Sequence, residues 1–262
     1  MSGNRLYRRD LLKALAALGG LVVSGCDRLS NEPHSRSVLD AANGLTYKAQ
    51  RLLIGADRLA PEYGEADISP DFRANGSTDP QDEAYLDLVG NQFADWRLKI
   101  DGLVEHELSL SLDDLRTLPA RTQITRHDCV EGWSCIGKWT GVPLSEILSR
   151  AGVRPEARFV VFHCADALDD GGFWVDPESI RYYESIDLID AAHPQTILAY
   201  DMNGEPLTVP HGAPLRLRLE RQLGYKMAKY VMRIELVRSF ADLRGGRGGY
   251  WEDRGYEWYA GI

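Results

Sequence analysis

The sequence is poor in cysteine and carries an excess of acidic residues. Four cysteines occur among 262 residues, and the formal net charge is −9. A chain of this length buries roughly 70–75% of its unfolded surface, so it needs no disulfide bonds to be stable. An acidic surface repels phosphate backbones, which argues against nucleic acid as a partner. The body of the chain also lacks an uncharged apolar run of about 18 residues, so we expect no membrane span after the N-terminal segment.

The first 26 residues have the composition of an export signal. Arg8 and Arg9 precede an apolar run from Ala14 to Val23, which is too short to span a bilayer comfortably. The twin arginine, followed by Leu and Lys residues, resembles a Tat signal. Because Tat carries proteins that are already folded, this signal suits a chain that acquires a complex cofactor in the cytoplasm.

The apolar run ends at Val23-Ser24-Gly25-Cys26, which resembles a lipobox. Each buried methylene of a lipid attached to Cys26 contributes roughly 0.8 kcal/mol to anchoring. Asp27 at the next position favours retention on a proteobacterial inner membrane. We therefore expect a periplasmic protein that is exported by Tat and anchored through Cys26. The alternative is a signal that is simply cleaved, in which Cys26 is incidental.

The remaining chain divides into a tether and one domain. Residues 27–56 are largely polar and predict a tether, and residues 57–262 predict the folded domain. The start of this domain, residues 57–82, is rich in Pro, Gly and Asp and predicts a long loop. The tail from Gly245 to Ile262 is rich in Gly, Trp and Tyr, and we expect it to wrap the surface.

Strands outnumber helices in the body. Ser111, as an N-cap with Asp114 three residues later, predicts a short helix that Pro119 ends, and a second helix is predicted over residues 144–151. An Asn203-Gly204 pair predicts a hairpin turn. Alternating or buried apolar residues predict strands over 96–100, 108–110, 122–125, 158–162, 196–200, 215–219 and 230–237. Many strands with interspersed short helices indicate the α+β class.

Residues 126–143 hold the most informative motif. They contain Cys-Val-Glu-x-Trp-Ser from Cys129, followed by Trp-Thr-Gly-x-Pro-Leu from Trp139. This pattern resembles the molybdenum-binding loop of the sulfite-oxidase fold family, in particular its bacterial branch of protein-methionine-sulfoxide reductase catalytic subunits. The resemblance implies a sulfite-oxidase-type molybdopterin-binding fold, a Mo-molybdopterin cofactor and Cys129 as the ligand to the metal. A soft thiolate suits a metal that is already held by two dithiolene sulfurs.

A second stretch, residues 197–229, resembles the cofactor-phosphate region of the same family. There His211 precedes Gly-Ala-Pro, Arg216 follows, and a Lys-x-x-Lys segment closes the site. Arg, Lys and backbone N–H groups bind phosphates well. The resemblance implies two weaker matches, Asn75 and Cys164. The family has Thr at the position of Cys164, so whether Cys164 contacts the pterin stays open. The implied cofactor-binding residues are Asn75, Cys164, His211, Arg216, Met227, Ala228 and Lys229.

Several residues near the motif keep two interpretations. Glu131 lies two positions after Cys129, and it either shuttles a proton to the metal site or braces the loop. A zinc site formed by His127, Cys129, Cys135 and His163 is an alternative whose spacing matches no closed tetrahedral pattern. A disulfide between Cys135 and Cys164 also stays open.

The resemblance implies an oxidoreductase that transfers an oxygen atom to or from a small or protein-borne substrate. We expect it to reduce an S-oxide or N-oxide, with protein methionine sulfoxide as one candidate, because the loop after Cys129 differs from that of sulfite oxidases proper. Two alternatives stay open. One is a sulfite-type oxidase that passes electrons to a cytochrome, and the other is a binding protein that has lost the metal.

The expected partner follows from what the chain lacks. It contains no Cys-x-x-Cys-His motif for haem attachment, and about 25 residues follow the last predicted strand, too few for the dimerisation domain of full-length sulfite oxidases. We therefore expect a monomer that exchanges electrons with a separate membrane haem protein or quinone-linked protein. Anchoring through Cys26 would place it beside such a partner.

Overall fold

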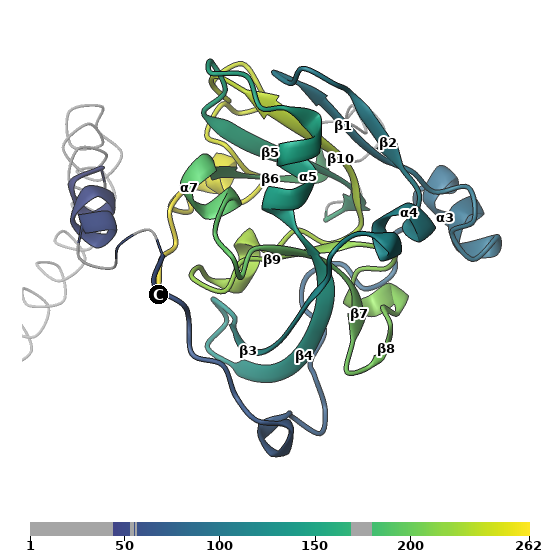
Figure 1. Cartoon of the computed structure of the whole chain (residues 1–262). Helices are drawn as coiled ribbons and strands as arrows, with labels where there is room; N and C mark the ends of the chain where they lie inside the picture. The colour runs from purple at the N-terminus through teal and green to yellow at the C-terminus, as the bar shows by residue number, and fades with distance from the viewer. Residues whose placement is uncertain (1–43, 53–54, 56, 169–179) are drawn as a thin grey trace, which may run out of the picture. The chain divides into compact units, whose positions relative to one another are not determined.

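The computed structural model describes residues 44–52, 55, 57–168 and 180–262 (Figure 1). The predicted export signal lies outside the described residues. Residues 44–52 form a helix, where the sequence predicts part of a polar tether. The chain divides into two units, residues 1–54 and 55–262. In the described part of the chain, no helix has both the length and the apolar character needed to cross a membrane.

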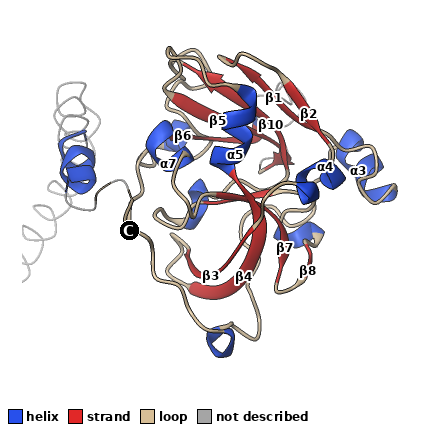
Figure 2. Ribbon diagram, in the orientation of Figure 1, coloured by secondary structure: helices blue, strands red, loops and turns tan. Residues whose placement is uncertain are grey.

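Two sheets form the framework of the second unit (Figure 2). In the first sheet β1 (Leu98–Gly102) pairs with β10 (Val231–Val237) in parallel, and the other neighbouring strands are antiparallel. Its strands, in spatial order, are β2 (Leu108–Leu110), β1 (Leu98–Gly102), β10 (Val231–Val237), β5 (Phe159–Ala167) and β6 (Arg181–Asp187). The second sheet runs β3 (Arg121–Asp128), β4 (Ser134–Pro143), β7 (Ile197–Met202) and β8 (Glu205–Pro206), and β9 (Arg216–Arg218) also pairs with β7.

The helices of this unit are short. They are α3 (Glu83–Gly90), α4 (Leu112–Thr117), α5 (Leu144–Ala151) and α7 (Leu188–Ala191), together with 3-10 turns at Glu65–Asp67, Val209–His211, Gly224–Lys226 and Glu252–Arg254. The predicted N-cap of α4 is confirmed, because Ser111 Oγ accepts from the N–H of Asp114 and the Asp114 carboxylate accepts from the N–H of Ser111. α5 ends at Gly152, which adopts the left-handed conformation with φ 68°.

Buried apolar side chains from both sheets and from α5 form the main core. Trp96, Leu98 and Ile100 are fully buried at one end of it, and Val160 to Phe162 of β5 are fully buried at its centre. All seven predicted strand regions contain a strand, so strands with short helices agree with the predicted α+β class. Four elements were not predicted from the sequence, namely α3, β4, β6 and α7.

The C-terminal tail differs from its prediction. Rather than lying only on the surface, it contains buried residues: Tyr250, Glu252 and Ala260 are each less than 10% exposed. The backbone of Tyr250 donates to the carbonyl of Tyr183 in β6 at 2.9 Å. The tail is therefore part of the packed structure next to the first sheet.

Candidate functional site

The predicted metal-binding loop is a tight hairpin between β3 and β4. The two strands pair up to Asp128 and Ser134. Within the loop, the N–H of Cys129 donates to the carbonyl of Trp133 at 2.9 Å, and the N–H of Gly132 donates to the carbonyl of Cys129 at 3.0 Å. Gly132 has φ 86°, a left-handed conformation that glycine adopts without strain. These bonds fix the position of Cys129 at the start of the loop, directly after β3.

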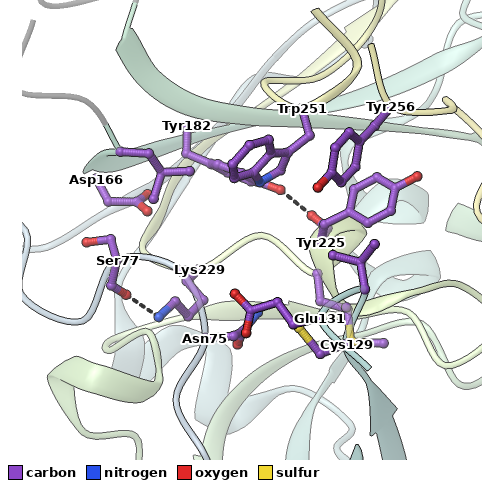
Figure 3. Close-up of a pocket in the computed structure, with 15 residues that line it drawn as sticks. Asn75, Ser77, Cys129, Glu131, Asp166, Tyr182, Tyr225, Lys229, Trp251 and Tyr256 are labelled. Carbon is purple, nitrogen blue, oxygen red and sulfur yellow. Dashed lines mark hydrogen bonds between the residues drawn. The ribbon is translucent and has the colours of Figure 1, made fainter. Parts of the chain in front are cut away.

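The thiol of Cys129 faces a cavity of about 140 Å³ (Figure 3). The residue is only 9% exposed, and burial raises the pKa of its thiol, an effect that backbone N–H groups of Glu131 and Val130 oppose. Five of the residues predicted for the site line this cavity, namely Asn75, Cys129, Glu131, Met227 and Lys229. The fold thus brings together segments that lie up to 154 positions apart in the chain.

Glu131 is held by its own loop. Its carboxylate accepts from Trp133 Nε1 at 2.9 Å and lies 3.9 Å from Arg73 Nη2. The guanidinium of Arg73 also lies over the Trp133 ring, 5.2 Å from its centroid. These contacts favour the bracing role of Glu131, and its place in the cavity lining keeps the proton-transfer role as a prediction.

The other four predicted cofactor residues do not line the cavity. Cys164 is buried in the core on β5. His211 bonds to the carbonyl of Phe72 at 3.0 Å, so it supports the segment that carries Asn75. The carbonyl of Ala228 accepts from the N–H of Leu217 at 2.8 Å, which joins the Met227–Lys229 segment to β9. Arg216 is the fourth. It belongs to a buried cluster of three cations, Arg216, Arg218 and Lys229.

Arg216 is a buried cation without a carboxylate partner among the described residues. Its Nη1 donates to the carbonyl of His211 at 3.0 Å, and its Nε and Nη2 have no hydrogen-bond partner in the described part of the chain. Burial and the charge of Arg218 lower the pKa of Arg216 to about 9. Burial and Arg216 likewise lower the pKa of Lys229. Because a buried unpaired cation is costly, this cluster fits the phosphate of a molybdopterin.

His127 lies on β3, two residues before Cys129, and is fully buried as a neutral imidazole. Burial and the nearby cations, above all Arg218, hold its pKa well below the ordinary value. Its Nδ1 lies 3.1 Å from Arg218 Nη1 and 3.3 Å from Met227 Sδ. A Cβ on Gly224 would lie 2.4 Å from the His127 ring, so this position requires glycine.

Neither the zinc site nor the disulfide is formed. The described residues contain no group of three or more His, Cys, Asp or Glu side chains that could hold a metal ion. His163 instead bonds to Glu235 at 2.9 Å in the first sheet. Cys135 and Cys164 are both free thiols, on strands of different sheets.

Several residues of the cavity lining were not predicted from the sequence. Asp166 is 3% exposed, its Oδ1 has no hydrogen-bond partner among the residues that the structure describes, and burial raises the pKa of its carboxyl. Four aromatic residues also line the cavity, namely Tyr182, Tyr225, Trp251 and Tyr256. The only signal for the last two was the aromatic composition of the tail, which does not reveal where the tail packs.

Comparisons with known proteins agree with the motif. The model of the "Oxidoreductase molybdopterin binding domain" family matches residues 86–242. An Azospira oryzae protein named "Putative protein-methionine-sulfoxide reductase subunit YedZ1" is 36% identical over 255 residues, which cover 97% of this chain and 87% of that protein. The protein-methionine-sulfoxide reductase catalytic subunit MsrP of Xanthomonas campestris pv. campestris is 31% identical over 238 residues, 90% of this chain and 71% of that protein.

A solved structure is also similar. The sulfane dehydrogenase SoxCD from Paracoccus pantotrophus matches with a TM-score of 0.49 and 26% identity, over 60% of this chain. The match spans 44% of that solved chain. The family predicted from residues 126–143 is confirmed by the family model and by the relatives. This chain belongs to the family of oxidoreductases with a molybdopterin-binding domain, and its cofactor is a molybdopterin.

Proposed function

We propose that this chain is the catalytic subunit of a reductase for neutral S-oxides, with methionine sulfoxide in proteins as the leading candidate substrate. The names of the Azospira and Xanthomonas relatives support this substrate class. The alternative within the family is an oxidase acting on sulfite, an anion.

The charge balance of the cavity carries the proposal. Among the described lining residues there are two acidic side chains, Glu131 and Asp166, and one basic side chain, Lys229. The ammonium of Lys229 already donates to the carbonyls of Ser77 and Pro210. A sulfite anion needs several cations to offset its desolvation and to stabilise its charge. A neutral sulfoxide needs none, so the cavity suits a sulfoxide better.

The reaction consumes two electrons and two protons, converting a sulfoxide to a thioether and water. The molybdenum cofactor supplies the two-electron oxygen-atom transfer when it is bound. Cys129 would hold the metal through its thiolate, and Arg216 with Lys229 would hold the cofactor phosphate. Asp166 retains a proton at a higher pH than an ordinary carboxyl because it is buried, so it is a proton carrier within the cavity lining.

The location and electron source complete the proposal. The signal-like residues 1–26 and the lipobox ending at Cys26 support Tat export to the periplasm and a lipid anchor in the inner membrane. Because the chain has no haem-attachment motif, its electrons would come from a membrane haem protein or quinone-linked protein. The word "subunit" in the relatives' names supports such a partner. We propose that the catalytic chain itself is monomeric.

Dye-linked assays on protein purified from its own membrane fraction test this function. Reduced benzyl viologen should be oxidised in the presence of peptide-borne methionine sulfoxide, and ferricyanide should not be reduced in the presence of sulfite. The opposite pattern would identify a sulfite-type oxidase. A Cys26→Ala variant should appear in the soluble periplasmic fraction, and its retention in the membrane would contradict the lipid anchor.

A further inference from the structure

The C-terminal tail places two aromatic side chains in the cavity lining. Trp251 and Tyr256 stack on each other with ring centroids 5.2 Å apart, and Tyr225 meets Tyr256 edge to face at 5.2 Å. Figure 3 shows Trp251 and Tyr256 across the cavity from Cys129 and Glu131. These three aromatic residues, Tyr225, Trp251 and Tyr256, are called the aromatic wall.

A buried charged triad holds the wall in place. Lys226 Nζ lies 2.5 Å from Glu184 Oε1 and 2.6 Å from Glu252 Oε1, and all three side chains are at most 1% exposed. Glu252 follows Trp251 directly, and Lys226 follows Tyr225. The hydroxyl of Tyr225 also donates to the carbonyl of Glu257 at 2.6 Å. The wall is therefore preorganised, so a ligand that packs against it loses little additional entropy.

The cavity has an apolar side and a polar side. The wall is apolar, and Val130, beside the thiol of Cys129, is a large apolar side chain that remains 47% exposed. The polar side carries Asp166, together with Asn75 and Lys229, which would hold the cofactor. A sulfoxide has the same division, because its S–O group is strongly polar and its two flanking groups are alkyl.

We propose that Trp251 and Tyr256 are specificity-determining residues that bind the alkyl groups flanking the sulfoxide, so that the enzyme selects dialkyl S-oxides longer than dimethyl sulfoxide. The methionine side chain, with its S-methyl and two methylenes, belongs to this class. The inference rests on the proposed function and extends it from the reaction to the substrate. Sulfur and alkyl groups pack favourably on aromatic rings, and each methylene buried there tightens binding about fourfold.

The test compares dimethyl, diethyl and dipropyl sulfoxide. Their Kd values are measured by calorimetry on the oxidised holoenzyme without reductant, so that no turnover occurs, and their KM values are measured in the dye assay. In the wild type, Kd should fall about fourfold for each added methylene that the wall buries. In Tyr256→Ala and Trp251→Ala this dependence should weaken to about twofold or less.

Two further variants separate the wall from general effects on the tail. Phe240→Ala removes an aromatic ring that packs on Phe159 and Trp258 and does not line the cavity, so the chain-length dependence should stay at its wild-type value. Tyr256→Phe keeps the ring and should also keep the dependence. Molybdenum content and melting temperature are measured for every variant. If Trp251→Ala does not fold, Tyr256→Ala decides, because Tyr256 is 38% exposed.

The outcomes distinguish the wall from the proposed function. An unchanged chain-length dependence in Tyr256→Ala, or none in the wild type, overturns the assignment of the wall. Chain-length-dependent binding that is lost in Tyr256→Ala, without any sulfoxide reduction by the wild type, supports the wall and contradicts the reductase function. Loss of the dependence with reduction intact supports both.

Discussion

Lys226 and Arg216 are both fully buried cations, yet their surroundings differ completely. Lys226 is bonded to the carboxylates of Glu184 and Glu252 at 2.5 and 2.6 Å. Arg216 has no carboxylate partner among the described residues, and two of its nitrogens are unbonded. A buried charge normally has a partner. Lys226 therefore has a structural role, and for Arg216 we propose that a negatively charged ligand supplies the missing partner.

Lys226→Met should show the largest effect of any single change in this comparison. It leaves the carboxylates of Glu184 and Glu252 buried side by side without a cation, which costs about 3–5 kcal/mol of folding free energy. Denaturant unfolding of the metal-free protein measures this loss. An unfolding free energy within about 1 kcal/mol of the wild type would show that the triad does not hold the tail.

Arg216→Met should have the opposite sign in the metal-free protein. Replacing a buried unpaired cation with an apolar side chain of similar length should be neutral or stabilising by about 1–4 kcal/mol. The same variant should lose molybdopterin, because it lacks the proposed contact with the phosphate. Unfolding of the metal-free protein and the pterin content of the purified holoenzyme are the two readouts. If the variant is less stable but retains its full pterin content, Arg216 stabilises the fold, as Lys226 does, and does not bind the cofactor.

The pH dependence of stability sharpens the description of the triad. Burial, together with Glu252, raises the pKa of the Glu184 carboxyl well above its usual range. The folded state therefore binds a proton that the unfolded state releases near its ordinary pKa of about 4.3. Glu184 thus stabilises the fold fully below that pH, and this contribution is lost as the pH rises through the folded-state pKa.

Glu184→Gln should remove this pH dependence. Unfolding free energies of the wild type and the variant, measured between pH 4 and pH 8, should converge at the acidic end and diverge as the pH rises, with the wild type losing stability. Parallel curves would indicate that Glu184 is ionised throughout and that Lys226 neutralises it fully.

Glu131→Gln should show the smallest effect on stability. Its side chain is 61% exposed and 3.9 Å from Arg73, so the ion pair contributes at most about 1 kcal/mol. The variant keeps the shape of the carboxyl and its contact with Trp133, so a bracing role predicts a kcat close to the wild-type value. A proton-transfer role predicts a lower kcat with an altered pH profile, which steady-state assays across pH would reveal.

The same two cations show how far the sequence could predict the structure. Arg216 was predicted as a cofactor-binding residue because it follows a Gly-Ala-Pro motif, a local pattern in the chain. Lys226 lies beside that pattern, but its partners are 42 and 26 positions away, and no local signal connects them. The helix N-cap at Ser111 and the Asn203-Gly204 turn between β7 and β8 were predicted for the same reason, since each depends on residues a few positions apart.

Long-range packing accounts for most of what was missed. Trp251 and Tyr256 lie in the cavity lining because long-range contacts hold the tail, among them the pair of Glu252 with Lys226 and the backbone bond of Tyr250 to β6. Asp166 lies in β5, a strand that was predicted only as far as Phe162 from its apolar residues. Nothing in those residues indicated that the Asp166 carboxyl would be buried near Lys229. The composition of the tail predicted a surface position. In the structure part of the tail is buried, and Glu252 pairs there with Lys226.

Molybdenum per chain, measured by elemental mass spectrometry on the mature protein from its own membrane fraction, tests the assignment of Cys129 most directly. The wild type should contain about one molybdenum per chain, the stoichiometry of a single thiolate-ligated site. Cys129→Ala should lose the metal or, if the pterin still retains it, should lose redox activity. A wild-type protein without molybdenum, made in cells able to synthesise the cofactor, or a Cys129→Ala variant with full metal content and activity, would contradict the assignment.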